Sequence, residues 1–267
     1  MFALRPITSH SHALRNQSLD ALDATPRTVV AIGTDYVPDT FLNTHSHRRA
    51  QLLYGATGLM EVNTGEGAWV IPPHCGVWIP AGKPHSVKMV GVSTCSLYVE
   101  PDDAPRGPLL CEVLAVSALL RLLLIEAIDL PALYDEDGRD GLLMSLVLAE
   151  VARAKALPFF APLPRDERLA ALCTAFLHQP DVRISPLVWA QQLHQSERTF
   201  SRFFRAQTGM SFADWRSQAC LLSAVSQLTM GKSVTTVALQ LGYDSPGAFS
   251  TMFRKKLGSK PSNFITT

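Results

Sequence analysis

The sequence of 267 residues has few cysteines, and their placement argues against two common uses of this residue. Cys75, Cys95, Cys111, Cys173 and Cys220 are scattered and odd in number, and no CxxC or Cys/His zinc spacing occurs. A disulfide framework and a zinc finger are therefore not expected. Because thiols persist in reducing compartments, the expected location is the cytoplasm.

The sequence also lacks a long uninterrupted hydrophobic run. Residues 1–23 contain no apolar stretch of signal-peptide length. The most apolar stretch, Leu109–Leu130, includes four charged residues, and a charge at the centre of a membrane is costly. This stretch is expected to be a buried or interface helix, and no membrane partner is expected.

Charge of one sign is not in excess over the whole chain, because the net charge is only +1. The distribution is nevertheless uneven: residues 163–267 carry 12 Lys and Arg against 6 Asp and Glu, whereas residues 1–162 carry 12 against 17. A hydrophobic content of 47% excludes a disordered polyelectrolyte. The basic C-terminal third predicts a polyanionic partner for that part alone.

Turn-forming residues divide the chain into regions of different pattern. Short strand-like runs separated by Gly, Pro and Asn predict a small β sandwich or barrel up to about residue 100. Two helices are expected over Leu109–Ile128 and Asp140–Leu157, as a hairpin. The expected division is a loose tail (1–25), a β-rich domain (26–157) that includes the hairpin (about 109–157), a linker (158–166) and an all-α domain (167–267).

An internal repeat in the all-α domain is the strongest signal in the sequence. Ser196–Trp215 matches Ser245–Phe264 at an offset of 49, with six identical positions. Each copy is expected to be a helix, a short turn and a second helix that begins at a capping serine. In the first copy Phe200, Phe203 and Phe204 fall at i, i+3 and i+4, which predicts one buried stripe.

Arginine and hydroxyl side chains gather on the face opposite this stripe. For one isolated helix a solvated surface is the simpler interpretation. Two such copies in a basic domain instead favour recognition helices for successive major grooves, separated by a helix at about Phe212–Met230. The expected DNA contacts are Ser196, Arg198, Thr199, Ser201, Arg202 and Arg205 in the first copy, and Ser245, Gly247, Ser250, Thr251, Arg254 and Lys255 in the second.

The two copies differ in what they can recognise. Arg198 and Arg202 can form bidentate contacts with guanine edges. Gly247 and Thr251, at matching places in the second copy, suit thymine methyls or DNA shape, while Arg254 and the lysines after it suit phosphate. Sequence discrimination is therefore expected mainly from the first copy.

Residues 185–264, with the segments SERTFSRFFRAQTG and SVTTVALQLGYDSPGAFSTMFRKKLGSKPSNF, resemble the DNA-binding domain of the AraC/XylS transcription regulators. The resemblance implies a non-enzymatic regulator that binds double-stranded promoter DNA, and RNA polymerase if it is an activator. One departure is Cys220-Leu221, which stands where the family usually has Arg-Leu in the connecting helix. The usual polar contacts of that position are therefore in question here.

Histidines form a second pattern, in the β-rich domain. His45 and His47 are followed by Gln51 and Gly58, and the segment PAGKPH ends at His85. The patterns HxH-x3-Q-x6-G and PxGxxH resemble the two cupin motifs. This resemblance implies a cupin-like β-barrel with His45, His47, Gln51 and His85 at the metal-ligand positions.

Whether this barrel binds a metal is left open by the sequence. Gln51 stands where cupin enzymes have a carboxylate, which lowers the affinity for a divalent cation such as Zn, Ni or Fe. The alternative is a barrel without metal that holds a small-molecule effector. The expected pocket residues are His45, His47, Gln51, Tyr54, Trp69, Trp78 and His85, with ordinary core packing as the other interpretation of the aromatic ones.

Three functions are compatible with these observations, on an α+β multidomain fold with a C-terminal pair of helix-turn-helix motifs. The first is a DNA-binding regulator modulated by a small-molecule effector, with the hairpin helices pairing two subunits into a homodimer. The second is a cupin metalloenzyme with an accessory nucleic-acid-binding domain, against which Gln51 and the basic repeat argue. The third, an RNA-binding or architectural protein, is disfavoured because the deep major groove of RNA does not admit such helices.

Overall fold

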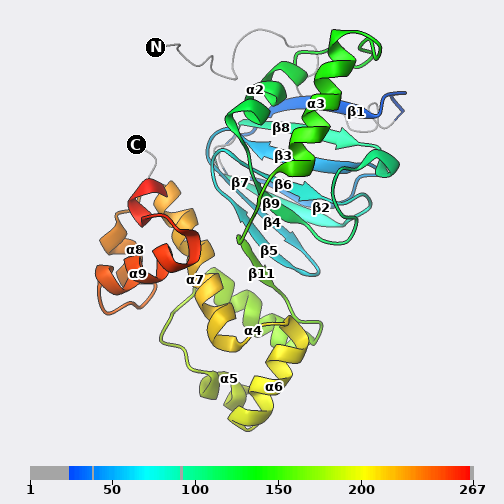
Figure 1. The fold of residues 1–267 in the computed structure, drawn as a ribbon. Helices are drawn as coiled ribbons and strands as arrows, with labels where there is room; N and C mark the ends of the chain where they lie inside the picture. Colours follow the sequence, from blue (N-terminus) through cyan, green and yellow to red (C-terminus); the bar gives the residue numbers. More distant parts are fainter. Residues whose placement is uncertain (1–23, 38, 91–92, 265–267) are drawn as a thin grey trace. The chain divides into compact units, whose positions relative to one another are not determined.

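A computed structural model describes residues 24–37, 39–90 and 93–264 of the chain. These residues form two compact units (Figure 1). Among the described residues, the first unit combines residues 24–60 with residues 71–157, and the second combines residues 61–70 with residues 158–264. Most of the expected loose tail, residues 1–25, lies outside the described residues.

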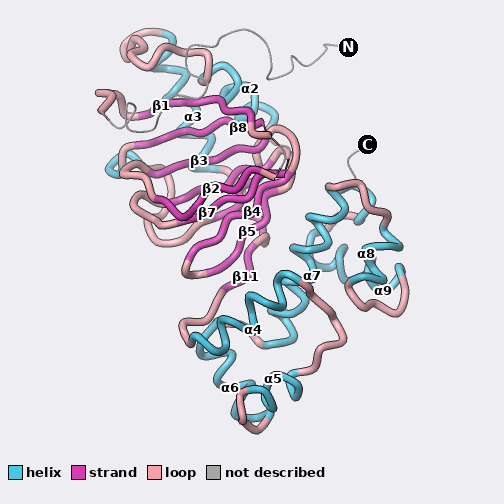
Figure 2. The backbone as a smooth tube through the Cα atoms, turned by 180° about the vertical axis from the view of Figure 1, so that it is seen from behind, coloured by secondary structure: helices cyan, strands magenta, loops and turns pink. Residues whose placement is uncertain are grey.

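Eleven strands form two antiparallel sheets within the described residues (Figure 2). The six-stranded sheet has the order β1-β8-β3-β6-β9-β10, and the five-stranded sheet the order β11-β5-β4-β7-β2. The strands are β1 (Val29–Asp35), β2 (Thr40–His45), β3 (Ala50–Gly55), β4 (Leu59–Thr64), β5 (Gly67–Ile71), β6 (Cys75–Ile79), β7 (His85–Val90), β8 (Ser93–Val99), β9 (Glu112–Ala115), β10 (Ala156–Leu157) and β11 (Phe160–Pro162).

The expected α+β fold class is confirmed, with one difference in the β-rich part. The strands in the described residues form two sheets and not a closed barrel. β10 and β11, which end the two sheets on one side, are only two and three residues long. Such short strands cannot continue a ladder far enough to close it.

The six-stranded sheet has a different set of residues on each face. β3 pairs with β8 so that Leu52 lies opposite Leu97, and Gln51 lies opposite Tyr98. Because side chains alternate along a strand, Leu52 and Tyr54 share one face, and Gln51 is on the other. The face with Leu52 belongs to a hydrophobic core that also contains residues of both hairpin helices.

These two helices are α2 (Ala118–Ala127) and α3 (Arg139–Arg153), and both are shorter than expected. Figure 1 shows them together against the six-stranded sheet. The expectation of a helix from residue 109 was wrong, because residues 112–115 pair with β6 as strand β9. The Ser117 hydroxyl then accepts a hydrogen bond from the amide of Leu120, which starts α2. Residues 156–157, expected at the end of the second helix, form β10.

The second unit is mainly helical, as expected. Its helices are α4 (Glu167–His178), α5 (Pro186–Gln192), α6 (Glu197–Thr208), α7 (Phe212–Thr229), α8 (Val234–Gln240) and α9 (Pro246–Leu257), followed by the short 3-10 helix η2 (Pro261–Phe264). Gly209 and Gly258 end α6 and α9 in the left-handed conformation, with φ of 73° and 71°. Glycine adopts this conformation without a steric penalty, so the repeat stops both helices at equivalent positions.

The expected linker, residues 158–166, is ordered and packed within the second unit. Phe160 in β11 stacks on Trp69 of β5, with ring centroids 4.4 Å apart. Trp215 of α7 donates its indole N–H to the Pro162 carbonyl at 2.7 Å, and Gln218 donates its amide to the Pro158 carbonyl. This segment is therefore hydrogen-bonded to α7 at both Pro158 and Pro162.

No helix in the described part of the chain combines the length and the apolar character that a membrane span requires.

Candidate nucleic-acid interface and histidine site

The first helix-turn-helix copy consists of α5 and α6. Phe200 and Phe204 of α6 are fully buried, and Phe203 is partly buried. The rings of Phe200 and Phe204 lie against Trp189 of α5 at 6.4 and 6.2 Å. The expected apolar stripe is thus confirmed. Its opposite face is exposed and carries Ser196, Arg198, Thr199, Ser201, Arg202 and Arg205.

The second copy, α8 and α9, has the same interior. Phe249 and Phe253 are fully buried, and their rings lie 5.6 Å apart. Phe264 of η2 and Tyr243 complete the aromatic contacts. The exposed residues of this copy are Ser245, Gly247, Thr251, Arg254 and Lys255, whereas Ser250 is partly buried.

Several hydroxyl groups that were expected to contact DNA form hydrogen bonds within their own recognition helix. The Ser196 hydroxyl accepts from the Thr199 amide at 3.2 Å and bonds the Thr199 hydroxyl at 2.8 Å. Ser245 accepts from the Ala248 amide at 3.1 Å. The Thr251 hydroxyl donates to the carbonyl four residues earlier at 3.0 Å. These serines satisfy amides that would otherwise be unpaired at the start of α6 and α9.

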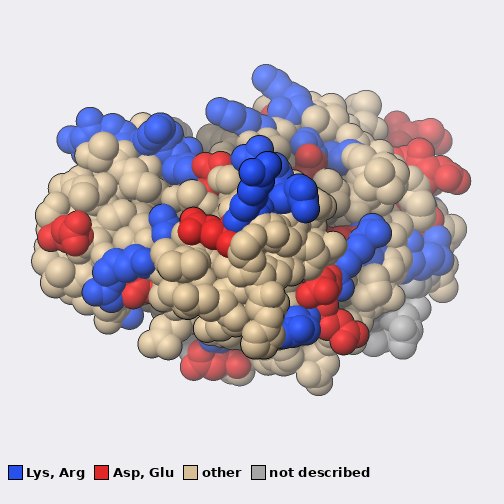
Figure 3. Space-filling view, turned by 90° about the horizontal axis from the view of Figure 1, so that it is seen from below, with Lys and Arg blue, Asp and Glu red and all other residues tan. Residues whose placement is uncertain are grey.

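The arginines of α6 have their guanidinium groups available. Arg198, Arg202 and Arg205 are exposed, and none of the ion pairs recorded among the described residues includes them. Figure 3 shows Lys and Arg side chains in several separate groups on one face, with acidic side chains between them. Basic groups of this kind provide donors for phosphate oxygens and base edges.

α7 connects the two copies and sets their separation. Its 18 residues span about 27 Å, which is comparable with a DNA turn of about 34 Å. Cys220 on this helix is completely buried, and burial raises the pKa of its thiol to about 12. Arg216, one turn earlier, donates to the Ile184 carbonyl and lies 5.9 Å from the Phe212 ring centroid. Arg216 is partly buried, and its i, i+4 spacing from Phe212 is the sequence signal that accompanies this contact.

The histidine site is formed where β2 meets β7. His45 at the end of β2 lies opposite His85 at the start of β7, and their ring centroids are 4.4 Å apart. The His47 ring lies 4.8 Å from His45 and 5.3 Å from His85. One ring nitrogen from each histidine lies within 4.8 Å of the others. The structure therefore brings together three of the expected ligands.

Backbone contacts orient two of these rings. The Nδ1 atoms of His45 and His85 lie 2.6 and 2.9 Å from the carbonyl oxygens of Asn43 and Lys83. A carbonyl can only accept, so both Nδ1 atoms carry a hydrogen, and in the neutral form of each ring the Nε2 atom then offers its lone pair. The Nε2 of His85 is buried and has no hydrogen-bond partner.

The interior of the site favours neutral imidazoles. Burial, together with the charges of His45 and His85, lowers the pKa of His47 to about 4. Burial also lowers the pKa of His85. Gln51 donates its amide to the Ser96 and Tyr98 hydroxyls, both at 3.1 Å, which leaves its buried Oε1 without a partner.

This donor set fits a divalent transition metal. Three imidazoles with free lone pairs are common ligands of Zn, Ni and Fe. The unpaired Oε1 of Gln51 and the unpaired Nε2 of His85 are the buried atoms that a cation would satisfy. Carbonyl contacts to the far ring nitrogens are the usual support of metal-binding histidines.

The aromatic residues expected in the effector pocket lie elsewhere. Tyr54 and Trp78 are on the sheet face that packs against α2 and α3, because Tyr54 shares the face of Leu52 on β3 and Trp78 of β6 lies opposite Leu52. Trp69 belongs to the second unit, where it stacks on Phe160. The prediction that Tyr54, Trp69 and Trp78 line the effector pocket with the histidines is therefore replaced by core packing.

Two residues beside the histidines were missed by the sequence analysis. Ser96 and Tyr98 of β8 hold the Gln51 amide, and the Tyr98 ring lies 5.3 Å from His47. The alternation of CSLYVE places both on one strand face. Only the register of β8 against β3 shows that this face is shared with Gln51.

Comparison with known proteins agrees with these two units. A family model described as an AraC-like ligand binding domain matches residues 29–148, and one described as a helix-turn-helix domain matches residues 189–267. The HTH-type transcriptional regulator NimR of Escherichia coli K12 is 30% identical over 222 residues, which cover 83% of this chain and 81% of that protein. The chain belongs to the AraC family of transcriptional regulators. It is thus a DNA-binding regulator with an effector-binding sensor domain.

Other similarities of this AraC-family regulator are more limited. The arabinose operon regulatory protein of Escherichia coli K12 is 30% identical over 137 residues, or 48% of this chain and 46% of that protein. A structure of ToxT from Vibrio cholerae covers 90% of this chain and all of its own, at 9% identity and a TM-score of 0.37. The DNA-binding domain of AdpA, solved with a target DNA, is 33% identical over 35% of this chain, covers 86% of its own length and has a TM-score of 0.33.

Proposed function

We propose that this regulator binds promoter DNA as a homodimer, with α6 and α9 of each subunit in successive major grooves. The observation that carries this proposal is the repeated helix-turn-helix, whose two recognition helices each bury a phenylalanine stripe and expose donors. In this arrangement Arg198 and Arg202 contact base edges, and Arg254 and Lys255 contact phosphates. The proposed role is regulation without catalysis, and it is supported by relatives whose names describe them as regulators.

The surface that pairs the subunits is assigned to the hairpin helices. Leu119 and Leu122 on α2, and Leu142 and Leu146 on α3, are exposed although they are large and apolar. Their i, i+3 and i, i+4 spacings place each pair on one helix face. A second copy of the chain offers the same leucines, and a two-fold interface is self-complementary by construction.

The proposed compartment is the cytoplasm, where the five free thiols would stay reduced.

The histidine site is proposed as the place where the small-molecule effector binds. His45, His47 and His85 would hold a divalent metal through ring nitrogens, with Gln51 as an oxygen donor. A bound metal would supply a Lewis-acidic position for an effector oxygen or nitrogen. Because His45 ends β2 and His85 begins β7, a metal held by both histidines would link these two strand ends. Binding of the metal would therefore favour the conformation in which the two ends lie together.

Selection of bound duplexes from a random pool tests the DNA-binding proposal. The enriched sites should show two unequal elements about one helical turn apart, with the more specific element assigned to α6. Competition with random duplex and with RNA should leave the specific complex intact. Enrichment of no sequence, or an equal preference for RNA, would contradict the proposal.

Metal analysis of the purified protein tests the histidine site separately. We expect close to one metal per chain after exposure to Zn, Ni or Fe, and loss of that metal in His47→Ala and His85→Ala. His178→Ala, on α4, is the matched control and should keep it. Metal that binds wild type and His47→Ala equally would exclude the site without affecting the DNA-binding proposal.

A further inference from the structure

A cleft in the first unit shares no residue with the histidine site. It has a volume of about 280 Å³ and is formed where the end of β9, the start of α2 and the end of α3 meet. One part of its lining is apolar and the other part is polar or charged. The lining residues are Ala115, Val116, Leu120 and Ala154, and Ser117, Glu150, Arg153 and Lys155.

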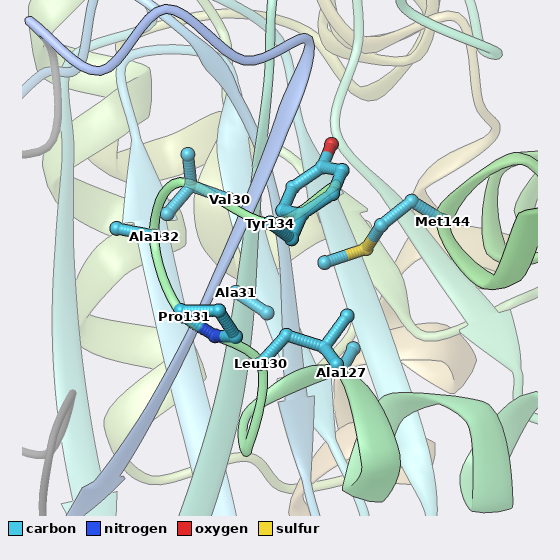
Figure 4. A pocket seen from close by; sticks show the side chains of 8 residues that line it. All are labelled: Val30, Ala31, Ala127, Leu130, Pro131, Ala132, Tyr134 and Met144. Atoms are coloured by element: carbon cyan, nitrogen blue, oxygen red, sulfur yellow. The ribbon is translucent and has the colours of Figure 1, made fainter. Parts of the chain in front are cut away.

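A smaller pocket in the same unit offers a useful contrast. It is too small to hold a water molecule and is lined almost entirely by apolar side chains, among them Leu130, Pro131 and Met144 (Figure 4). Its one polar side chain is Tyr134, whose hydroxyl points away from Leu130 and Pro131 in Figure 4. A site that binds a specific small molecule needs a few placed polar groups, and only the larger cleft has them.

Glu150 is the central feature of the cleft. Glu150 is only 8% exposed, and it is the one buried acidic residue in the described part of the chain. Its Oε1 lies 3.0 Å from Nη1 of Arg153, and its Oε2 accepts a long hydrogen bond of 3.4 Å from the Ser117 hydroxyl. A carboxylate can accept about four hydrogen bonds, so this group has unused capacity.

The partner of Glu150 compensates its burial only in part. The Arg153 side chain is 76% exposed, and a pair with such an exposed member is screened by water. Taking a carboxylate out of water is unfavourable unless donors replace the lost water. An additional cationic donor inside the cleft would therefore be bound favourably by Glu150.

Two positively charged side chains lie at the solvent-exposed edge of the cleft, beside Glu150. Arg153 and Lys155 are both exposed, and both line the cleft. Because the Arg153 guanidinium stands 3.0 Å from the Glu150 carboxylate, opposite charges lie side by side on one wall. A ligand with an ammonium and a carboxylate on the same carbon matches this pair, and its side chain would pack against Leu120 and Val116.

We propose that this cleft binds an α-amino acid with a short aliphatic side chain. The ammonium of the ligand contacts Glu150, and its carboxylate contacts Arg153 at the mouth. Backbone contacts hold the cleft in shape, since the Ala115 amide donates to the Lys155 carbonyl at 2.9 Å and the Ser117 hydroxyl accepts from Leu120 at 3.0 Å. Because the cleft is already held in this shape, the protein loses little conformational entropy when the ligand binds.

Calorimetric titration of the full-length protein with three related compounds tests the proposal. L-valine is the amino acid, isobutylamine lacks its carboxylate, and isovalerate lacks its ammonium. We expect saturable binding of L-valine, and binding of each fragment that is weaker by about tenfold or more, since each loses one charge-assisted contact. The titration contains no DNA, so its failure would leave the proposed DNA binding untouched.

Variants assign each charge to its residue. Glu150→Gln should reduce L-valine binding to the level of isovalerate. Arg153→Ala, at an exposed position, should reduce it to the level of isobutylamine without weakening isobutylamine itself. Glu126→Gln on α2 removes an exposed carboxylate outside the cleft and is the matched control, which should bind as wild type does.

Two results would overturn the proposal: no saturable binding of L-valine by wild type, or wild-type affinity in Glu150→Gln. Circular dichroism shows whether each variant is folded. Should Glu150→Gln fail to fold, the Arg153→Ala result decides, because this exposed change leaves the core intact. Equal loss of L-valine and isobutylamine in Arg153→Ala would contradict the assigned orientation.

Discussion

The two recognition helices, α6 and α9, have the same interior and different exteriors. Phe200 and Phe204 in α6 correspond to Phe249 and Phe253 in α9, and all four are fully buried. On the outside, α6 exposes arginines from its first turn to its third, whereas the cations of α9 are confined to its last turn. Packing therefore preserves the motif, while the exposed face is free to differ in what it recognises.

The surroundings of the two stripes also differ. Phe204 lies against Trp189, Phe212 and Trp215, at ring distances of 5.4 to 6.2 Å. Phe253 lies against Phe264, at 5.2 Å. The first copy thus depends on a larger aromatic cluster, and it should contribute more to the stability of the second unit.

Truncation of the stripes should have the largest effect and would test this difference directly. Phe204→Ala and Phe253→Ala should each lower the free energy of unfolding by about 3–5 kcal/mol, because each leaves a cavity in a packed core. The loss should be larger for Phe204→Ala. Urea denaturation measures both, with Phe203→Ala as the partly buried control. An equal loss would show that the extra aromatic contacts do not add stability.

Removal of one arginine from each helix should separate base recognition from phosphate binding. Arg202→Ala should cost about 1–3 kcal/mol of binding free energy and relax the preference at one base position. Arg254→Ala should weaken binding to all sequences alike. Affinity measured on a panel of singly substituted sites gives the answer. A uniform loss in Arg202→Ala would contradict the assignment of α6 to base contacts.

Loss of the capping serines should have a smaller effect, similar in both copies. Ser196→Ala and Ser245→Ala should each lower the free energy of unfolding by about 1 kcal/mol, because a helix amide loses its acceptor. Ser201→Ala, on the exposed face of α6, should change it little and serves as the control. If Ser196→Ala affects DNA affinity without affecting stability, the hydroxyl contacts DNA directly.

The smallest effect is expected from a single phosphate contact of α9. Lys255→Ala should weaken binding a few-fold and reduce the dependence of log affinity on log salt concentration by about one unit. Titrations at several salt concentrations measure this slope. An unchanged slope would place Lys255 outside the interface, and the comparison of the two helices would then depend on Arg254 alone.

Much of the second unit was predictable because its signals are local. The stripe, the capping serines and the terminal glycines are each defined within one or two helical turns. The hairpin helices were less predictable, since Leu109–Leu130 is mostly apolar and periodicity alone does not separate a short strand from a helix. In the structure this run contains β9 followed by α2.

The proximity of the three histidines was predictable, whereas the residues around them were not. His45, His47, Gln51 and His85 come from recognisable spacing, and the three histidines are close together as expected. Tyr54 and Trp78 could not be excluded by sequence, because large apolar side chains occur on both faces of their strands. Their side of the sheet is known only from the core they share with α2 and α3.

The sequence alone determined the repeated helix-turn-helix, because periodicity, caps and helix ends are properties of neighbouring residues. It also indicated most of the side chains that are exposed on α6 and α9, with Ser250 as the exception. Only the tertiary structure decided which residues surround the histidines, and only it placed Glu150, Arg153 and Ser117 around one cleft. Such contacts join residues far apart in the chain, and their formation depends on strand register and packing rather than on local propensity.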